Sequence, residues 1–283
     1  MSASLEQDLE HLRGWIGRSE QASETLSPEL VDRFNATFDL GGRPARPGDV
    51  APLLVQFCLA QPASRTADLA GDGHPRRGGF LPPVPLPRRM WAGGRLQFLR
   101  DLKVGDLVTR RSRIEDVSLK TGKSGGLCFV TVAHSYASGG DPVVQEIQTL
   151  VYRSPAGGGS GAPQESPALR GDHVERVEPT PPLLFRYSAL TFNGHRIHYD
   201  HPYATGVEGY PGLVVHGPLQ ATLLIQFAER LLGSPPRSFV FRSVSPLFDD
   251  QPFELHATRE GDAVRLWTAR LGGPVAMQAE ASA

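Results

Sequence analysis

Apolar residues near the start of the chain recur at helical spacing. Their steps of three or four positions predict an amphipathic helix over residues 4–17, carried by Leu5, Leu9, Leu12 and Ile16. A second helix is expected to begin after Ser27 and to run to about Thr37. Ser27 is a favourable N-cap, and Pro28 has the φ angle that the first helical position requires. The chain therefore opens with two short helices.

The middle of the chain changes to a pattern typical of strands. Residues 62–95 are so rich in Gly, Pro and Arg that we expect an ordered loop there, and neither a helix nor a central strand. From residue 94 to residue 153, alternating apolar and polar positions predict a β-meander of roughly four strands. Its turns are expected at KTGKSGG and SGGD.

A stretch of Gly, Ser, Pro and Ala at residues 154–175 predicts a flexible linker. It divides the chain into an N-terminal unit, residues 1–153, and a C-terminal unit, residues 176–283. In the second unit, the run TPPLLFRYSALTFNGHRIHYD is expected to form a strand, a turn and an extended segment.

A long apolar helix is predicted next, from about Gly217 to a C-cap at Gly233. Strands are then expected at SFVFRSVSPLF, QPFELHATREGD, AVRLWTARLG and PVAMQAEA. Each unit thus combines helix with antiparallel strands, which predicts a duplicated α+β unit.

Composition and charge exclude several classes of protein. The 29 basic and 30 acidic residues give a net charge of −1, so no global field attracts nucleic acid or an anionic membrane. No run approaches the ~20 apolar residues that span a bilayer. The N-terminal run MSASLEQDLEHLRGWIG lacks the apolar core of a signal peptide, so we expect a cytoplasmic protein. Cys58 and Cys128 have no metal-ligand spacing and are expected to be reduced thiols in the core.

Titratable side chains crowd into the stretch NGHRIHYDHPYATGVEGYPGLVVHG, namely His195, His198, Asp200, His201 and His216. A polar surface loop with local hydrogen bonds is one interpretation. A metal site formed by His195, His198, His201 and Asp200 is a second. The three-residue step suits ligands on a helix, whereas RIHYDHPY is β-branched, aromatic and followed by proline, so we expect it to be extended and disfavour a metal.

The spacing of this stretch resembles the MaoC-like, or (R)-specific enoyl-CoA hydratase, branch of the hotdog fold. The motif positions of that family read here Asn193, His198, Asp200, Ala204 and His216 followed by Gly217. RYSALTFNGHRIHYDHPYA, together with LPRRMWAGGRLQF in the first unit, is closer still to the double-hotdog subgroup that includes mesaconyl-C4-CoA and itaconyl-CoA hydratases. The resemblance implies an α+β double hotdog in which each half is an antiparallel sheet wrapped around a helix, the first half degenerate and the second catalytic.

The resemblance also implies a role for each motif residue. His198 would be the acid-base group, with an unperturbed pKa near ~6.5. Asn193 stands where the family has Asp and would position water, since an amide is no base. Asp200, two residues on in an extended segment, would share a face with His198 and bias its tautomer. The N–H of Gly217 would donate to the thioester oxygen, and His216 would support the site by packing.

Substrate-binding residues are expected on both sides of the linker. Arg88, Arg89 and Arg196 are candidates for the CoA phosphates, with Arg196 the first candidate to pair with a free carboxylate on the acyl group. Trp91 would line the acyl pocket, and His195 would adjoin the substrate.

The implied reaction is reversible hydration of a short branched enoyl-CoA, giving citramalyl-CoA from mesaconyl-C4-CoA or itaconyl-CoA. No metal or redox cofactor is implied, since CoA is part of the substrate. Assembly into a homo-oligomer that completes the fold is compatible with the resemblance. Two alternatives stay open: a hotdog thioesterase, and a binding module for acyl thioesters without activity.

Overall fold

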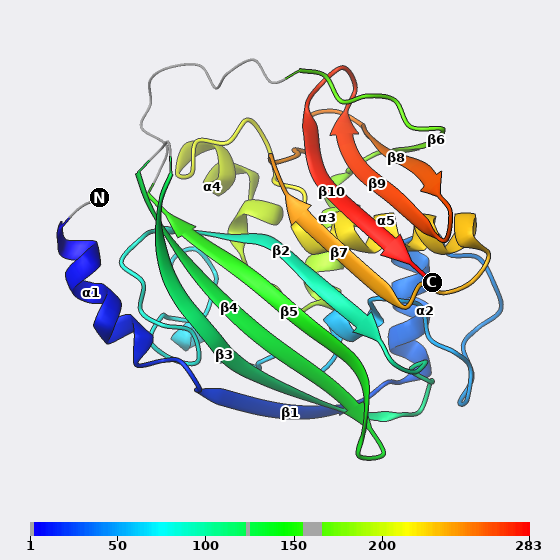
Figure 1. The fold of residues 1–283 in the computed structure, drawn as a ribbon, viewed down its shortest axis with the longest axis horizontal. Helices are drawn as coiled ribbons and strands as arrows, with labels where there is room; N and C mark the ends of the chain where they lie inside the picture. The colour runs from blue at the N-terminus through cyan, green and yellow to red at the C-terminus, as the bar shows by residue number, and fades with distance from the viewer. Residues whose placement is uncertain (1–2, 123–124, 155–165) are drawn as a thin grey trace.

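The computed structural model describes residues 3–122, 125–154 and 166–283. Its strands join into one antiparallel sheet in the order β1-β3-β4-β5-β2-β7-β10-β9-β8-β6 (Figure 1). The strands of the first half are β1 (Ser19–Thr25), β2 (Arg88–Phe98), β3 (Leu107–Gly122), β4 (Gly125–Ser138) and β5 (Asp141–Arg153). Those of the second half are β6 (His173–Val177), β7 (Ser238–Ser243), β8 (Phe253–Glu260), β9 (Ala263–Arg270) and β10 (Val275–Ser282).

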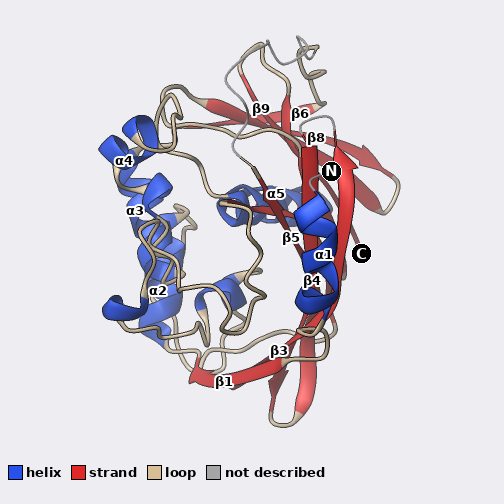
Figure 2. Cartoon of the chain, turned by 90° about the vertical axis from the view of Figure 1, so that its left-hand side faces the viewer, coloured by secondary structure: helices blue, strands red, loops and turns tan. Residues whose placement is uncertain are grey.

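Four of the five described α-helices lie on one side of this sheet, whereas α1 lies beside the strands and contacts β3 (Figure 2). Figure 2 shows α2, α3 and α4 on the side away from the strands, with α5 between them and the sheet. The α-helices are α1 (Ala3–Arg13), α2 (Pro28–Thr37), α3 (Pro181–Leu190), α4 (His201–Gly206) and α5 (Gly217–Leu232). Three short 3-10 turns are η1 (Val55–Cys58), η2 (Thr66–Asp68) and η3 (Arg196–His198).

The two halves repeat the same strand order. In the first half this order is β1-β3-β4-β5-β2, and in the second it is β6-β8-β9-β10-β7, so that β2 and β7 join the halves as antiparallel neighbours. The repeat extends to the helix that follows each edge strand. Ser27 caps α2 through Leu30 N, and Thr180 caps α3 in the same way through Leu183 N. A duplicated unit therefore underlies the sheet.

The halves differ in what fills their concave faces. In the second half, α5 packs on β8, β9 and β10, and its residues Leu224, Ile225 and Ala228 are fully buried. In the first half, the residues between α2 and β2 form only the short turns η1 and η2. The sheet of the first half thus lacks a long central helix among the described residues, which leaves space on its concave face.

Several elements match their prediction. The first two helices, the meander of β3 to β5, the final four strands and α5 with its left-handed C-cap at Gly233 are all present. Cys58 and Cys128 are buried free thiols. Within the described residues, no helix is long and apolar enough to cross a membrane.

Three local predictions are wrong. The strand expected after Thr180 is the helix α3, because a capping threonine followed by Pro181 starts a helix as effectively as the pair in α2 does. The loop predicted up to residue 95 ends earlier, since β2 starts at Arg88, directly after the last proline of that region. The run RIHYDHPY is not extended but forms η3 and α4.

The predicted linker, residues 154–175, is only partly within the described structure. Residues 155–165 lie outside the described residues, and the last part of the linker, from His173, belongs to β6.

The paired caps give a test of the duplicated helices. Ser27→Ala and Thr180→Ala should each lower the free energy of unfolding by about 1 kcal/mol, because each removes the acceptor for an N–H in the first helical turn. Urea denaturation measures this, with Ser234→Ala, at an exposed position after α5, as the matched control. Equal stability of the cap variants and the control would contradict the assigned helix starts.

Candidate active site

One large cavity, of about 1210 Å³, opens between the two halves. The first half contributes the loop around residues 72–81, the start of β2 and the polar inner face of β4 and β5. The second half contributes the end of α3, the segment 192–199 and the first turn of α5. The cavity lies on the concave face of the first half, where the described residues form no central helix. The first half thus leaves the space, and the second half contributes the start of α5.

His198 lies buried in this cavity wall at the end of η3. Its Nδ1 lies 2.7 Å from the carbonyl oxygen of Val214. A carbonyl only accepts, so Nδ1 carries the proton and donates, and Nε2 is left as an acceptor. The backbone N–H of Val214 in turn donates to the carbonyl of Ile197. The ring is therefore fixed both in position and in tautomer.

The environment keeps His198 neutral. Burial lowers the pKa of His198 to about 4, and the hydrogen bond to Val214 only partly opposes this. Burial also lowers the pKa of His216 well below its usual value. Below pH ~6.5 these histidines are protonated in the unfolded chain but stay neutral in the folded protein. Protonation therefore favours the unfolded chain, and stability falls as the pH drops from ~6.5 towards 4.

His216 stacks on His198, with ring centroids 3.7 Å apart. Its Nε2 lies 2.8 Å from Ser188 Oγ, and its Nδ1 is buried without a partner among the described residues. A buried lone pair costs less than a buried N–H, so Nε2 carries the proton and donates to Ser188. His216 therefore packs between His198 and Ser188.

The first turn of α5 opens into the cavity at Gly217. His216, at the N-cap position, makes no side-chain capping bond. Pro218 has no N–H and Gln220 N donates to the carbonyl of His216, whereas the N–H of Gly217 has no backbone acceptor among the described residues and lies at the positive end of the helix dipole. A Cβ at position 217 would lie 2.8 Å from Trp91 Cε3, so only glycine fits against that indole. The expected donation from Gly217 N–H to a thioester oxygen stays a prediction, with which this position is compatible.

Asn193 lies on the cavity wall after the end of α3. The preceding residue, Phe192, has φ 50°, a left-handed conformation that is strained for a bulky side chain. Asn193 Oδ1 accepts from the N–H of His195 at 3.1 Å. With its oxygen used in this turn, Asn193 can offer a ligand its NH₂ group, which is a donor.

The expected role of Asp200 is wrong. Its carboxylate caps α4 by accepting from Tyr203 N and forms an ion pair with Arg196 at 2.8 Å. Because the segment is helical and not extended, Asp200 and His198 do not share a face, and the carbonyl of Val214 sets the tautomer instead.

Arg196 does not line the cavity either. Besides Asp200 it contacts the carbonyl of Gly71 and lies over the ring of Tyr203, so its charge is used within the protein. The structure therefore gives no support to Arg196 as the residue that pairs with a substrate carboxylate.

The other predicted binding residues, Arg88, Arg89, Trp91 and His195, all line the cavity. Arg88 is occupied by an ion pair with Glu208 at 3.3 Å. Trp91 stacks on Phe241 at 4.2 Å and forms part of the apolar wall. Arg89 makes no ion pair with any residue that the structure describes, and its charge lowers the pKa of the nearby His195. It is thus a cation available to a ligand.

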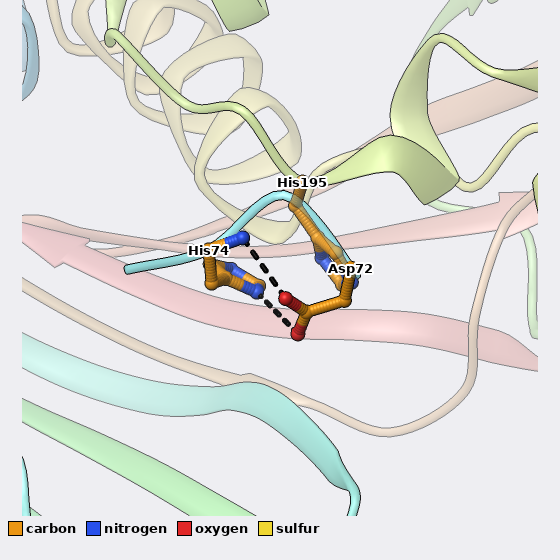
Figure 3. Close-up of side chains that lie close together, drawn as sticks. All are labelled: Asp72, His74 and His195. Atoms are coloured by element: carbon orange, nitrogen blue, oxygen red, sulfur yellow. Dashed lines mark hydrogen bonds and ion pairs between the residues drawn. The ribbon is translucent and has the colours of Figure 1, made fainter. Parts of the chain in front are cut away.

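Asp72 and His74 are the site residues that sequence reasoning missed. They come from the loop of the first half and lie against His195 (Figure 3). The ring centroids of His74 and His195 are 4.0 Å apart. The one signal in the sequence is the pattern of Asp, Gly and His in GDGHP, but nothing in it shows that this loop reaches the histidine cluster of the other half.

The same three residues are the group within the described structure whose geometry could hold a metal ion, with candidate ligand atoms within 4.8 Å of one another. The alternative set considered from sequence is not brought together, because His201 is exposed at the start of α4.

Comparisons with known proteins agree with this architecture. The family model of hydroxyacyl-thioester dehydratase type 2 matches residues 54–249. The chain is 43% identical to the mesaconyl-C(4)-CoA hydratase of Chloroflexus aurantiacus, over 94% of this chain and 95% of that protein.

Two solved structures support the fold. The MaoC-like dehydratase from Phytophthora capsici matches with a TM-score of 0.72 at 16% identity, covering 97% of each chain. A Mycobacterium tuberculosis protein with a double hotdog fold matches with a TM-score of 0.58 at 16% identity, covering 94% of this chain and 96% of that one. The predicted MaoC-like double hotdog is thereby confirmed.

The state of His198 can be measured directly. In ¹⁵N-histidine NMR spectra, His198 should be the neutral Nδ1–H tautomer at pH 6 and should protonate only near pH 4. His201, which is exposed, is the internal reference for a histidine outside the cavity. A midpoint near 6.5 for His198, or the Nε2–H tautomer, would contradict the assigned hydrogen bond.

Proposed function

Because the chain belongs to the hydroxyacyl-thioester dehydratase type 2 family, we propose that it is a hydro-lyase that adds water reversibly to a short branched enoyl-CoA. The 43% identity to a mesaconyl-C(4)-CoA hydratase over nearly the whole chain supports this reaction class. The observation that carries the proposal is the pairing of a neutral, tautomer-fixed His198 with the uncapped start of α5 in one cavity.

The residues divide the chemistry between them. His198 Nε2 accepts a proton from water while the water oxygen bonds to the β-carbon of the enoyl group. Negative charge then develops on the thioester oxygen, where the N–H of Gly217 and the dipole of α5 stabilise it. Asn193 holds the water or substrate through its NH₂ group, in place of the family's carboxylate. A buried base and helix amides suffice for this reaction, so we propose no metal or redox cofactor.

The acyl group that we propose is carboxylated, as in mesaconyl-C4-CoA or itaconyl-CoA, with citramalyl-CoA as the product. Arg89 supports this substrate class, because a free cation beside the histidines would pair with a carboxylate close to the reacting carbons. Arg89 thus takes the role that was expected of Arg196. The cavity volume leaves room for a branched acyl group and part of the pantetheine arm.

The two alternatives predict different products. A thioesterase would release free CoA, whereas a hydratase consumes the enoyl absorbance and keeps the thioester intact. A binding module would bind acyl-CoA without changing it. The fixed Nε2 acceptor of His198 favours catalysis over binding alone, because simple binding needs no buried neutral base.

Removing the base should abolish hydration. His198→Ala should lower kcat for mesaconyl-C4-CoA by at least ~10², since positioned acid-base groups contribute that much or more. Loss of enoyl absorbance measures the rate, and a thiol reagent monitors CoA release in parallel. His201→Ala, exposed at the start of α4, is the matched control and should keep its rate. Unchanged turnover in His198→Ala, or thiol release without loss of absorbance, would overturn the proposal.

Arg89 should determine substrate choice. Arg89→Ala should lower kcat/KM for mesaconyl-C4-CoA by ~30-fold or more. This loss corresponds to about 2 kcal/mol, the cost of leaving the substrate carboxylate without its partner. Crotonyl-CoA has no free carboxylate and serves as the control substrate, on which the variant should lose far less. Arg89→Lys should recover part of the loss. An equal loss on both substrates would assign Arg89 to CoA binding or to structure.

A further inference from the structure

The first half contributes the carboxylate of Asp72 to the site, where Asn193 stands at the position of the family's aspartate. Asn193 cannot exchange a proton, and Asp200 is occupied by Arg196. We propose that His74, held by Asp72, is the second proton-transfer group of the site and exchanges the proton at the α-carbon of the substrate. This inference rests on the proposed hydration and extends its machinery across the two halves.

The Asp72–His74 pair is built as an oriented dyad. Asp72 Oδ1 accepts from the backbone N–H of His74 at 3.0 Å, and Oδ2 lies 3.1 Å from His74 Nδ1 (Figure 3). The carboxylate therefore holds the proton on Nδ1 and leaves Nε2 free, which is the same tautomer that Val214 imposes on His198.

The loop that carries the dyad is locked onto the catalytic segment. The carbonyl of Asp72 accepts from the N–H of Arg196 at 2.9 Å, and Arg196 also donates to the carbonyl of Gly71. Between the dyad residues, Gly73 has φ +88°, and a Cβ there would lie 1.8 Å from the carbonyl oxygen of Gly194. No other residue permits this approach, so the placement of His74 beside residues 193–196 is specified by the sequence.

The rings of His74, His195 and His198 lie in series. His74 and His195 have centroids 4.0 Å apart, and His195 and His198 have centroids 5.3 Å apart in an edge-on arrangement. All three rings line the cavity. His195 thus lies between the two groups that we assign to the α- and β-carbons.

The proton balance closes over one turnover. His198 Nε2 takes one proton from water as the water oxygen bonds to the β-carbon, and the electron pair of the double bond moves to the α-carbon. Protonated His74 releases its Nε2 proton to the α-carbon. His198 has then gained one proton and His74 has lost one, and proton exchange with solvent restores both. The net change is the addition of one water molecule.

The charges around His74 connect this cycle to substrate binding. Burial, with the charges of Arg89 and Arg77, lowers the pKa of His74 to about 4, although Asp72 acts to raise it. The imidazole of His195 also faces the dyad. A substrate carboxylate that pairs with Arg89 cancels part of the opposing charge and favours protonation of His74 in the complex.

A metal ion at these residues is the rival interpretation. Both oxygens of Asp72 are already used by His74, and the unpaired charge of Arg89 acts on His74 and His195. A divalent cation would have to displace the Nδ1 proton and lie close to a guanidinium. The geometry therefore favours proton transfer.

Two substitutions test the dyad. His74→Gln should lower kcat by ~10² with a much smaller change in KM, as expected of a proton-transfer group. Asp72→Asn keeps the shape but not the charge, and should lower kcat and shift the pH profile of kcat, which a purely structural role would leave in place. Deuterium incorporation at the α-carbon in D₂O should fall in parallel with hydration. His201→Gln is the control, and melting temperatures show whether each variant is folded.

Each other outcome has a distinct meaning. Folded variants with wild-type kcat and pH profile would overturn the dyad while the hydratase stands. Stoichiometric zinc in the wild-type protein, lost from His74→Gln together with activity and removed by EDTA, would replace it with a metal site. Absence of hydration by the wild-type protein on mesaconyl-, itaconyl- and crotonyl-CoA would overturn the proposed function and the dyad together.

Discussion

The hydrogen bond from His198 Nδ1 to the carbonyl of Val214 is the constraint on which the rest of the site depends. It fixes the tautomer, and the reciprocal bond from Val214 N to the carbonyl of Ile197 fixes the register of η3 against the segment that leads into α5. Because α5 begins only two residues beyond Val215, this pair of hydrogen bonds also sets the position of the His198 ring relative to the N–H of Gly217. An imidazole on a mobile loop would have neither a fixed tautomer nor a fixed position relative to Gly217.

The two halves have diverged from one plan into complementary roles. Both keep the same strand order and a capped helix after the edge strand, so the sheet is continuous across β2 and β7. Among the described residues, the long central helix is found in the second half alone. Its N-terminus places the positive end of the helix dipole in the cavity. The absence of such a helix among the described residues of the first half leaves room for the cavity. The loop that takes its place carries Asp72 and His74, and the start of β2 carries Arg89.

Local signals in the sequence were sufficient where structure depends on neighbours in the chain. Ser27 with Pro28, the alternation after residue 94 and the Gly233 cap each act within a few positions, and each predicted element is present. His198 and Gly217, which the family spacing singled out, both line the cavity, His198 from η3 and Gly217 from the start of α5. The same kind of local signal is present at Thr180, where a capping threonine and two prolines begin a helix in place of the expected strand.

Contacts between distant segments could not be predicted in this way. The partner of His198 is a backbone carbonyl, which has no signature in the sequence. Asp200 and Arg196 looked like site residues because of their position in the motif, yet the helical turn directs them to each other. His74 lies more than a hundred positions before His195, and only the approach of Gly73 to Gly194 brings them together.

The most direct test of the central claim is the fate of water oxygen during turnover of mesaconyl-C4-CoA in H₂¹⁸O, followed by mass spectrometry of the intact acyl-CoA. We predict a single ¹⁸O in the acyl chain of a hydrated product whose thioester is unbroken. Label found instead in a free carboxylic acid, with release of unlabelled CoA, would contradict the account and assign the cavity to thioester hydrolysis.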